Sequence, residues 1–142
     1  MDERWECQLT IPDAHERTIY SISWGEACAT GLDSATELGW LASAGGDGAT
    51  RIWRVKVRNP AHVNSFHPLI DAATNEINGK LEPEGSSLGH ELLAHLPETH
   101  GDADVNAVSW CPKEGLRDLI ATVGDDRLMR VFKVVPSTDH AS

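Results

Sequence analysis

The sequence predicts an all-β fold in which one antiparallel unit occurs twice. Residues 15–24 and 40–55 have counterparts, in the same order, in residues 100–110 and 118–134. Within both copies, polar and apolar residues alternate or form short runs rich in β-branched and aromatic side chains, a pattern typical of strands. The intervening turns, GGDG and GDDR, contain the glycine and aspartate residues that tolerate the positive φ angles of tight hairpins.

We expect eight strands in the order d, a-b-c-d, a-b-c, where the letters follow the chain through each four-stranded unit, or blade. A strand d at residues 5–11 comes first. The first blade extends over residues 15–96 and ends with its own strand d at residues 91–96. The second blade, residues 100–135, has strands a, b and c but lacks a strand d. No segment requires a helix.

Two insertions interrupt the first blade. Residues 25–39 separate strands a and b, and residues 56–90 separate strands c and d. Both are rich in Gly, Pro, Ser, Asn and Asp, so we expect loops. The a-b and c-d connections of an antiparallel meander leave the sheet at the same end, so both insertions should lie there.

Length, composition and charge indicate a globular protein of the cytoplasm and the nucleus. The 142 residues suffice for one domain, and 40% hydrophobic and 24% charged residues are typical of globular proteins. The formal net charge of −10 argues against nucleic-acid binding, because neutralising phosphates requires a basic surface. The N-terminal residues lack the basic start and apolar run of a secretory signal, and no apolar run is long enough to span a membrane.

Each blade carries the same set of polar and aromatic residues: His15, Ser43, Asp47 and Trp53 in the first, and His100, Thr122, Asp126 and Phe132 in the second. Buried polar groups are costly unless they bond to one another. We therefore expect the aspartate to fix the imidazole, the imidazole to meet the hydroxyl, and the hydroxyl to accept the indole N–H. Because Phe132 has no donor, the second network should stop at its hydroxyl.

The same residue types serve in nucleophilic catalysis, which leaves a hydrolase as an alternative. Since a catalytic site is rarely built twice in one chain, we expect a structural role and no catalytic residue. The remaining histidines lack the spacing of metal ligands on a helix, and we expect no metal at His62, His67, His90 or His95. The three cysteines are far apart, which predicts neither a disulfide framework nor a zinc site and fits a reducing compartment: Cys7, Cys28 and Cys111.

The polar set resembles that of the WD40 repeat, with His before strand a, Ser or Thr on strand b, Asp in the b-c turn and Trp on strand c. The first blade matches all four positions, with Ala14-His15 in place of the usual Gly-His and Trp53-Arg54 in place of Trp-Asp. The resemblance implies a β-propeller segment, incomplete relative to a seven-bladed ring.

Longer stretches resemble one WD40 family in particular. AHERTIYSISW with GWLASAGGDG, and ELLAHLPETHGDADVNAVSWCPKEGL with DLIATVGDD, are similar to the last two blades of the WD40 protein of the cytosolic iron–sulfur protein assembly machinery, in its fungal form. The likeness implies a non-enzymatic scaffold that takes part in delivering clusters to cytosolic and nuclear apoproteins. Its partners would be the other subunits of that targeting complex and the apo client proteins. It implies no cofactor bound by this chain, which agrees with the scattered cysteines.

Two blades are fewer than a closed propeller needs, since seven blades of roughly 40 to 45 residues require about 300 residues. Three explanations stay open: a truncated or split product, a partial gene model, or a unit that assembles with copies of itself. In the third case, residues 5–11 would complete the last blade of another copy, and rings would contain about six or eight blades. A WD40 scaffold of another pathway, such as a chromatin or ubiquitin-ligase adaptor, is a further alternative.

The loops at the ends of the blades are the candidate contact regions. The d-a and b-c loops share one face and carry five candidate partner-binding residues: Arg17, Thr18, Asp102, Asp104 and Arg127. The alternating Arg54, Lys56 and Arg58 predict a solvated outer face of strand c, with contact to an acidic partner or to nucleic acid as the alternative. Trp24 and Trp110, at the ends of the a strands, are expected to be packing anchors.

Overall fold

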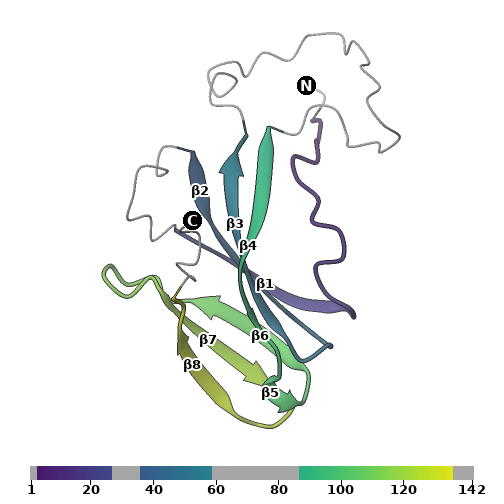
Figure 1. Ribbon diagram of the computed structural model, residues 1–142, viewed down its shortest axis with the longest axis vertical. Coiled ribbons are helices and arrows are strands. Elements are labelled where there is room, and N and C mark those ends of the chain that lie inside the picture. Colours follow the sequence, from purple (N-terminus) through teal and green to yellow (C-terminus); the bar gives the residue numbers. More distant parts are fainter. Residues whose placement is uncertain (1–2, 27–35, 59–86, 136–142) are drawn as a thin grey trace, which may run out of the picture.

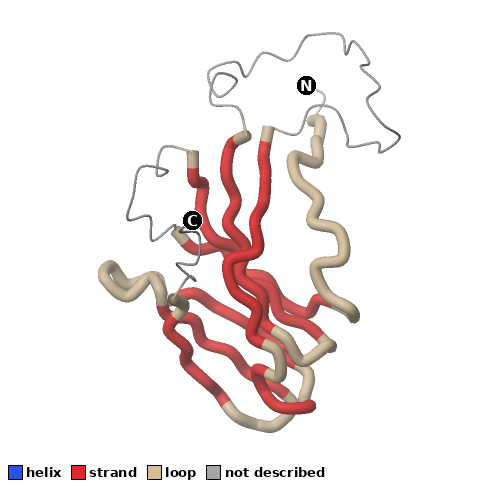
Figure 2. Tube along the Cα trace, in the orientation of Figure 1, coloured by secondary structure: helices blue, strands red, loops and turns tan. Residues whose placement is uncertain are grey.

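The computed structural model describes residues 3–26, 36–58 and 87–135, and these residues form strands and loops without a helix (Figures 1 and 2). The all-β prediction is confirmed, with one sheet of four strands and one of three. None of the elements in these three ranges is a helix long and apolar enough to cross a membrane.

The first sheet is the first blade. Its antiparallel strands follow chain order: β1 (Ile19–Gly25), β2 (Glu37–Gly45), β3 (Thr50–Val57) and β4 (Leu88–Leu96). The glycine-rich turn between β2 and β3 contains Gly48 at a φ of 73°, a conformation that glycine adopts without strain.

The second sheet is the second blade and contains β6 (Val105–Trp110), β7 (Leu119–Gly124) and β8 (Met129–Lys133). A short strand, β5 (Thr99–Asp102), lies in the connection from the first blade, where the sequence indicated only a loop. β8 forms the outer edge of this sheet (Figure 1).

Residues 5–11 are not a strand in this chain, which differs from the predicted strand d. The physical reason is that a strand forms by pairing with a neighbouring strand, and the two sheets of the described residues consist of β1 to β4 and β6 to β8. Trp5 in this segment is almost fully exposed. The assignment of residues 5–11 to a preceding blade therefore stays a prediction.

Most of both insertions, residues 27–35 and 59–86, lies outside the described residues. The residues that flank them are close together at one end of the first sheet. The backbone N–H of Val57 donates to the carbonyl of Thr36 at 2.8 Å, and that of Arg58 donates to the carbonyl of Ser87 at 2.7 Å. The two insertions thus begin and end side by side, as the antiparallel strand order requires.

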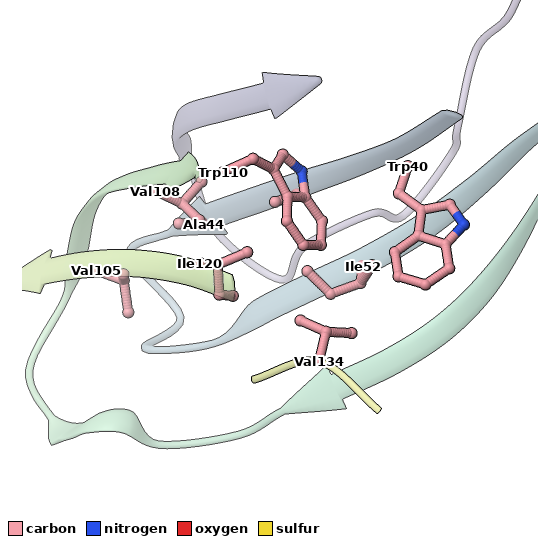
Figure 3. Packing of buried hydrophobic residues seen from close by; sticks show 9 residues of the cluster. Trp40, Ala44, Ile52, Val105, Val108, Trp110, Ile120 and Val134 are labelled. Carbon is pink, nitrogen blue, oxygen red and sulfur yellow. The ribbon is translucent and has the colours of Figure 1, made fainter. Parts of the chain in front are cut away.

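The hydrophobic core lies between the two blades (Figure 3). Trp40 of the first blade and Trp110 of the second approach each other with ring centroids 6.0 Å apart and planes tilted by 55°. Smaller apolar side chains fill the remaining space: Ala42, Ala44 and Ile52 from the first blade, and Val105, Val108, Ile120 and Val134 from the second. Burying a large apolar side chain stabilises a fold by about 1.5–3 kcal/mol, so this interface holds the two blades together.

Only one of the two tryptophans predicted as packing anchors is buried. Trp110 is in the core, whereas Trp24, at the corresponding position of the first blade, is more than half exposed. The difference follows from position in the fold: the face of the first sheet that carries Trp24 points away from the second sheet.

Candidate functional site

The four polar and aromatic residues of the first blade form a continuous hydrogen-bond network. The indole N–H of Trp53 donates to the Ser43 hydroxyl at 3.0 Å, and that hydroxyl lies 2.8 Å from Nε2 of His15. On the other side of the ring, Nδ1 of His15 lies 2.8 Å from Oδ1 of Asp47. The chain connects the d-a loop to β2, β3 and the turn between them.

Donors and acceptors in this chain can be assigned by elimination. The Asp47 carboxylate can only accept, so Nδ1 of His15 carries a hydrogen, and in the neutral imidazole Nε2 then accepts one from the Ser43 hydroxyl. Nη1 of Arg51 lies 2.8 Å from Nδ1 and 2.7 Å from Oδ2 of Asp47. Because arginine has no acceptor, the contact between Arg51 and His15 is between two donors that share one carboxylate.

Asp47 is the centre of the first network. Its Oδ1 accepts from His15 and from the backbone N–H of Ala49, and its Oδ2 accepts from Arg51 and from the backbone N–H of Glu16. Burial by itself raises the pKa of this carboxyl, but the hydrogen bonds, led by that of Arg51, outweigh burial and hold the pKa well below its ordinary range. Asp47 is therefore a fixed anion.

The second blade has the same arrangement without the indole. His100 places Nδ1 2.8 Å from Oδ1 of Asp126 and Nε2 2.9 Å from the Thr122 hydroxyl. Burial raises the pKa of Asp126, but hydrogen bonds from the Leu128 N–H, Arg130 and His100 lower it overall to about 2. Phe132 offers no donor to Thr122, so the chain ends at that hydroxyl.

Arg51 and Arg130 are members of the two networks that sequence reasoning missed. Each lies four residues after the network aspartate and forms an ion pair with it. The repeat contains a signal for this role, since both copies have arginine at this position. The signal is weak, because an arginine that alternates with apolar residues on a strand ordinarily points to solvent.

The geometry favours a structural role for both networks. Ser43 and Thr122 are buried, and the hydroxyl oxygen of each lies within hydrogen-bond distance of Nε2 of a histidine. A nucleophile must be reachable by a substrate, and the residues that carry these hydroxyls are only 4% and 1% exposed. As satisfied buried networks, both sets fix how the d-a loop sits against its hairpin.

Four of the five candidate partner-binding residues are exposed, namely Arg17, Thr18, Asp102 and Arg127. Arg127 has a φ of 65°, in the region that favours glycine, and it occupies the turn position that Gly48 occupies in the first blade. A residue with a side chain is strained at this φ, which lowers the free energy of unfolding. The exposed Arg127 side chain does not offset this cost by burial.

Thr18 and Asp104 also make hydrogen bonds within the fold. The carbonyl of Thr18 accepts the backbone N–H of Gly46 at 2.9 Å. Asp104 is half-buried, and its carboxylate accepts the phenol of Tyr20 from the neighbouring blade at 3.2 Å. That hydrogen bond, with the charge of Asp104, raises the pKa of Tyr20.

The histidines and cysteines considered for metal binding are dispersed. His62, His67 and Cys28 lie outside the described residues, while His90 packs edge-on against Trp53 with ring centroids 6.1 Å apart. Cys7 is exposed and Cys111 is partly buried, and both are free thiols. Among the residues that can be described, no three His, Cys, Asp or Glu side chains form a group that could hold a metal ion.

Two members of the basic stripe, Arg54 and Lys56 on β3, form ion pairs with glutamates of neighbouring strands, whereas the third, Arg58, is exposed. Arg54 forms ion pairs with Glu37 at 3.5 Å and Glu91 at 3.2 Å, and Lys56 lies 3.7 Å from Glu91. These pairs leave little positive charge free for an acidic partner, so they favour a solvated outer face.

The repeated blades, the interleaved core and the His–Asp–hydroxyl networks define the chain as a WD40-repeat segment, an incomplete propeller. The family model described as "WD domain, G-beta repeat" matches residues 90–133, which run from β4 through β8.

Individual relatives have closely similar names. The chain is 28% identical over 141 residues to "Probable cytosolic iron-sulfur protein assembly protein 1" of Neurospora crassa, covering 94% of this chain and 26% of the relative. It is 31% identical over 128 residues to the protein of the same name in Cryptococcus neoformans var. neoformans, covering 86% and 26%. It is 30% identical over 133 residues to "Probable cytosolic iron-sulfur protein assembly protein CIAO1" of Bos taurus, covering 94% and 28%.

These similarities are distant and concern part of each relative. The chain spans about a quarter of the length of the curated relatives that it matches. What those proteins assemble with therefore applies to this chain only as a proposal.

Proposed function

We propose that this chain is part of a non-enzymatic WD40 scaffold for cytosolic iron–sulfur protein assembly. The observation that carries the proposal is the similarity over nearly the whole chain to relatives named for this process, in two fungi and a mammal. In this role the chain holds other subunits of the targeting complex together with apo client proteins, in the cytoplasm and the nucleus. It binds no cluster of its own.

The contact surface in this proposal is the loop face formed by the d-a and b-c turns. Arg17 and Arg127 provide positive charge there, and Asp102 provides negative charge. Arg127 is the leading candidate, because a residue kept at positive φ despite its cost suggests a use outside the fold. Thr18 and Asp104 support this face through their bonds to Gly46 and Tyr20.

Capture of partners from cells tests the proposal. The tagged full chain is expressed in its own cells, and the captured proteins are identified by mass spectrometry. We expect subunits of the cytosolic iron–sulfur assembly machinery and apo iron–sulfur proteins to be enriched. Enrichment of chromatin or ubiquitin-ligase components in their place would assign the scaffold to another pathway and overturn the proposal.

Charge-reversal variants locate the surface. Arg17→Glu and Arg127→Glu should each reduce capture of these partners, because both residues are exposed on the loop face. Lys113→Glu is the matched control, since Lys113 is also exposed but lies in the β6–β7 connection at the opposite end of the blade. Equal loss in all three variants would contradict the assignment of the loop face.

A further inference from the structure

The beginning of the d-a loop is held differently in the two blades. In the first blade, the backbone N–H of Glu16 donates to Oδ2 of Asp47 at 3.2 Å, so the aspartate of the b-c turn binds the loop backbone directly. The counterpart of Glu16 is Gly101, whose N–H donates to the carbonyl of Glu98 at 2.9 Å. In the second blade this N–H is therefore used within the loop and not for Asp126, the aspartate of its b-c turn.

Arg130 makes the corresponding connection in the second blade. Its Nη1 donates to Oδ2 of Asp126 at 2.5 Å and to the carbonyl of Thr99 at 3.4 Å. The same nitrogen lies 2.7 Å from Nδ1 of His100, and these two donors share the Asp126 carboxylate. One atom of Arg130 thus joins the b-c turn to Thr99 and His100, where the d-a loop begins.

Arg51 duplicates a connection that the first blade already has. Its Nη1 donates to Oδ2 of Asp47 at 2.7 Å, but the same oxygen also accepts the N–H of Glu16. Loss of Arg51 would therefore leave a backbone bond between the turn and the beginning of the loop. Loss of Arg130 would leave no counterpart of that bond among the described residues, so the second loop depends more strongly on its arginine.

The end of the d-a loop is held in the same way in both blades. The N–H of Gly46 donates to the carbonyl of Thr18 at 2.9 Å, and the N–H of Asp125 donates to the carbonyl of Asp104 at 3.1 Å. The two blades thus differ at the beginning of the loop, which is where Arg130 acts.

Arg127 and Asp102 lie on the two segments that Arg130 joins. Arg127 follows Asp126 in the b-c turn, and the N–H of Leu128 donates to Oδ1 of Asp126 at 3.0 Å, which fixes the turn around the carboxylate. Asp102 lies in the d-a loop, two residues after its histidine. Hydrogen bonds behind a contact surface determine how precisely its side chains are placed. The bonds of Arg130 therefore control the position of Arg127 relative to Asp102.

We propose that Arg130 is a positioning residue for partner binding at the loop face. It acts through Asp126 and Thr99, and it holds the two exposed charges of Arg127 and Asp102 in a fixed relation. A preorganised pair of charges binds a partner at a smaller loss of conformational entropy than a pair on loops that move independently. This inference rests on the loop face as the contact surface in the proposed function.

Amide hydrogen exchange tests the positioning role without a partner. Arg130→Met keeps an aliphatic side chain of similar length but removes the donor. We expect exchange about tenfold faster at the hydrogen-bonded amides of Ala103 in the loop and Arg127 in the turn, because local opening becomes easier. Arg130→Lys keeps a cationic donor and should restore part of the protection, since all three contacts of Arg130 are made by one nitrogen.

Arg51→Met is the matched control. The N–H of Glu16 can stay bound to Asp47 in this variant, so exchange at Glu16 should change much less than exchange at Ala103 does in Arg130→Met. Equal local effects in the two variants would overturn the special role of Arg130. Faster exchange spread evenly over both sheets would also overturn it, because Arg130 would then contribute to global stability alone.

Partner dissociation tests whether the position is used in binding. The probe is an iron–sulfur assembly subunit that the unmodified chain captures from its own cells. Its dissociation should be about tenfold faster from Arg130→Met, and Arg130→Lys should restore part of the difference. In an Arg127→Glu background, Arg130→Met should add little, because the two residues act on one contact. Fully additive effects would overturn the proposal.

The two measurements separate this inference from the proposed function. Faster exchange in the loop of Arg130→Met with unchanged dissociation of the subunit would overturn the positioning role and leave the proposed function standing. Failure of the unmodified chain to capture any such subunit would overturn the proposed function and, with it, the use of the positioned charges.

Discussion

The Ser43 hydroxyl accepts the indole N–H of Trp53 at 3.0 Å, and this bond is what distinguishes the first network from the second. Thr122 occupies the place of Ser43 in the second blade, where Phe132, which has no donor, replaces Trp53. The two blades therefore provide an internal comparison. In each, a histidine, an aspartate and an arginine hold the d-a loop, but only the first blade adds the indole N–H of a tryptophan.

Trp53→Phe should convert the first network to the form of the second. We expect a loss of about 0.5–1.5 kcal/mol in the free energy of unfolding, because one hydrogen bond is removed while the aromatic ring stays. Urea unfolding of the variant and the unmodified chain measures the difference. A larger loss would mean that the tryptophan contributes chiefly through packing.

His15→Ala should cost more, about 1–3 kcal/mol, because it removes two hydrogen bonds at once, those of the His15 ring to Asp47 and to Ser43. His95→Ala is the control, since His95 is exposed on β4 and should have little effect. If His15→Ala left stability unchanged but abolished a hydrolytic turnover of the unmodified chain, the network would be catalytic.

The pKa of Asp126 predicts a loss of stability in acid. Its value falls from 3.8 to about 2 in the folded chain, so the folded state binds fewer protons than the unfolded state across this interval. The contribution of Asp126 is therefore fully present above about pH 4 and is lost as the pH falls toward about 2. Asp47, whose pKa is also lowered, acts in the same direction.

Unfolding measured from about pH 6 to about pH 2 checks this sign. Asp126→Asn should reduce stability at neutral pH and flatten the decline in acid, because asparagine does not titrate. A variant with a decline as steep as that of the unmodified chain would show that other carboxyls control acid unfolding.

The repeat explains why much of this molecule could be predicted from sequence. Strand order in a meander follows chain order, so matching His15 to His100 and Asp47 to Asp126 predicted the relative positions of these residues before any contact was known. The role of Arg51 was harder to predict, because its partner depends on where the d-a loop places His15 beside Asp47.

Features that depend on a neighbour could not be predicted from local pattern. Residues 5–11 alternate like a strand, but a strand exists only when another pairs with it. Trp24 and Trp110 occupy the same place in the repeat, yet only Trp110 meets a second sheet. Local sequence specifies a capacity for burial, while the arrangement of blades determines whether burial occurs.

The two tryptophans should respond differently to truncation. Trp110→Ala removes a buried ring from between the blades and should cost about 3–5 kcal/mol, a typical value for a core aromatic residue. Trp24→Ala changes an exposed ring and should cost no more than about 0.5–1 kcal/mol. Urea unfolding compares them, and equal costs would contradict the difference in burial between the two rings.

The b-c turns allow a paired test of backbone strain. Arg127 and Gly48 occupy corresponding turn positions at φ values of 65° and 73°. Arg127→Gly should stabilise the chain, because glycine adopts this conformation without the cost of roughly 1 kcal/mol that other residues bear. Gly48→Ala should destabilise it by a similar amount, and its added Cβ would also approach the carbonyl of Ala103 to 3.3 Å. Thermal unfolding measures both changes, and a shift of the same sign in the two variants would show that φ does not control the stability of these turns.

If Arg127→Gly raises stability and also weakens partner capture, then the arginine is retained at this position for binding and at the expense of stability.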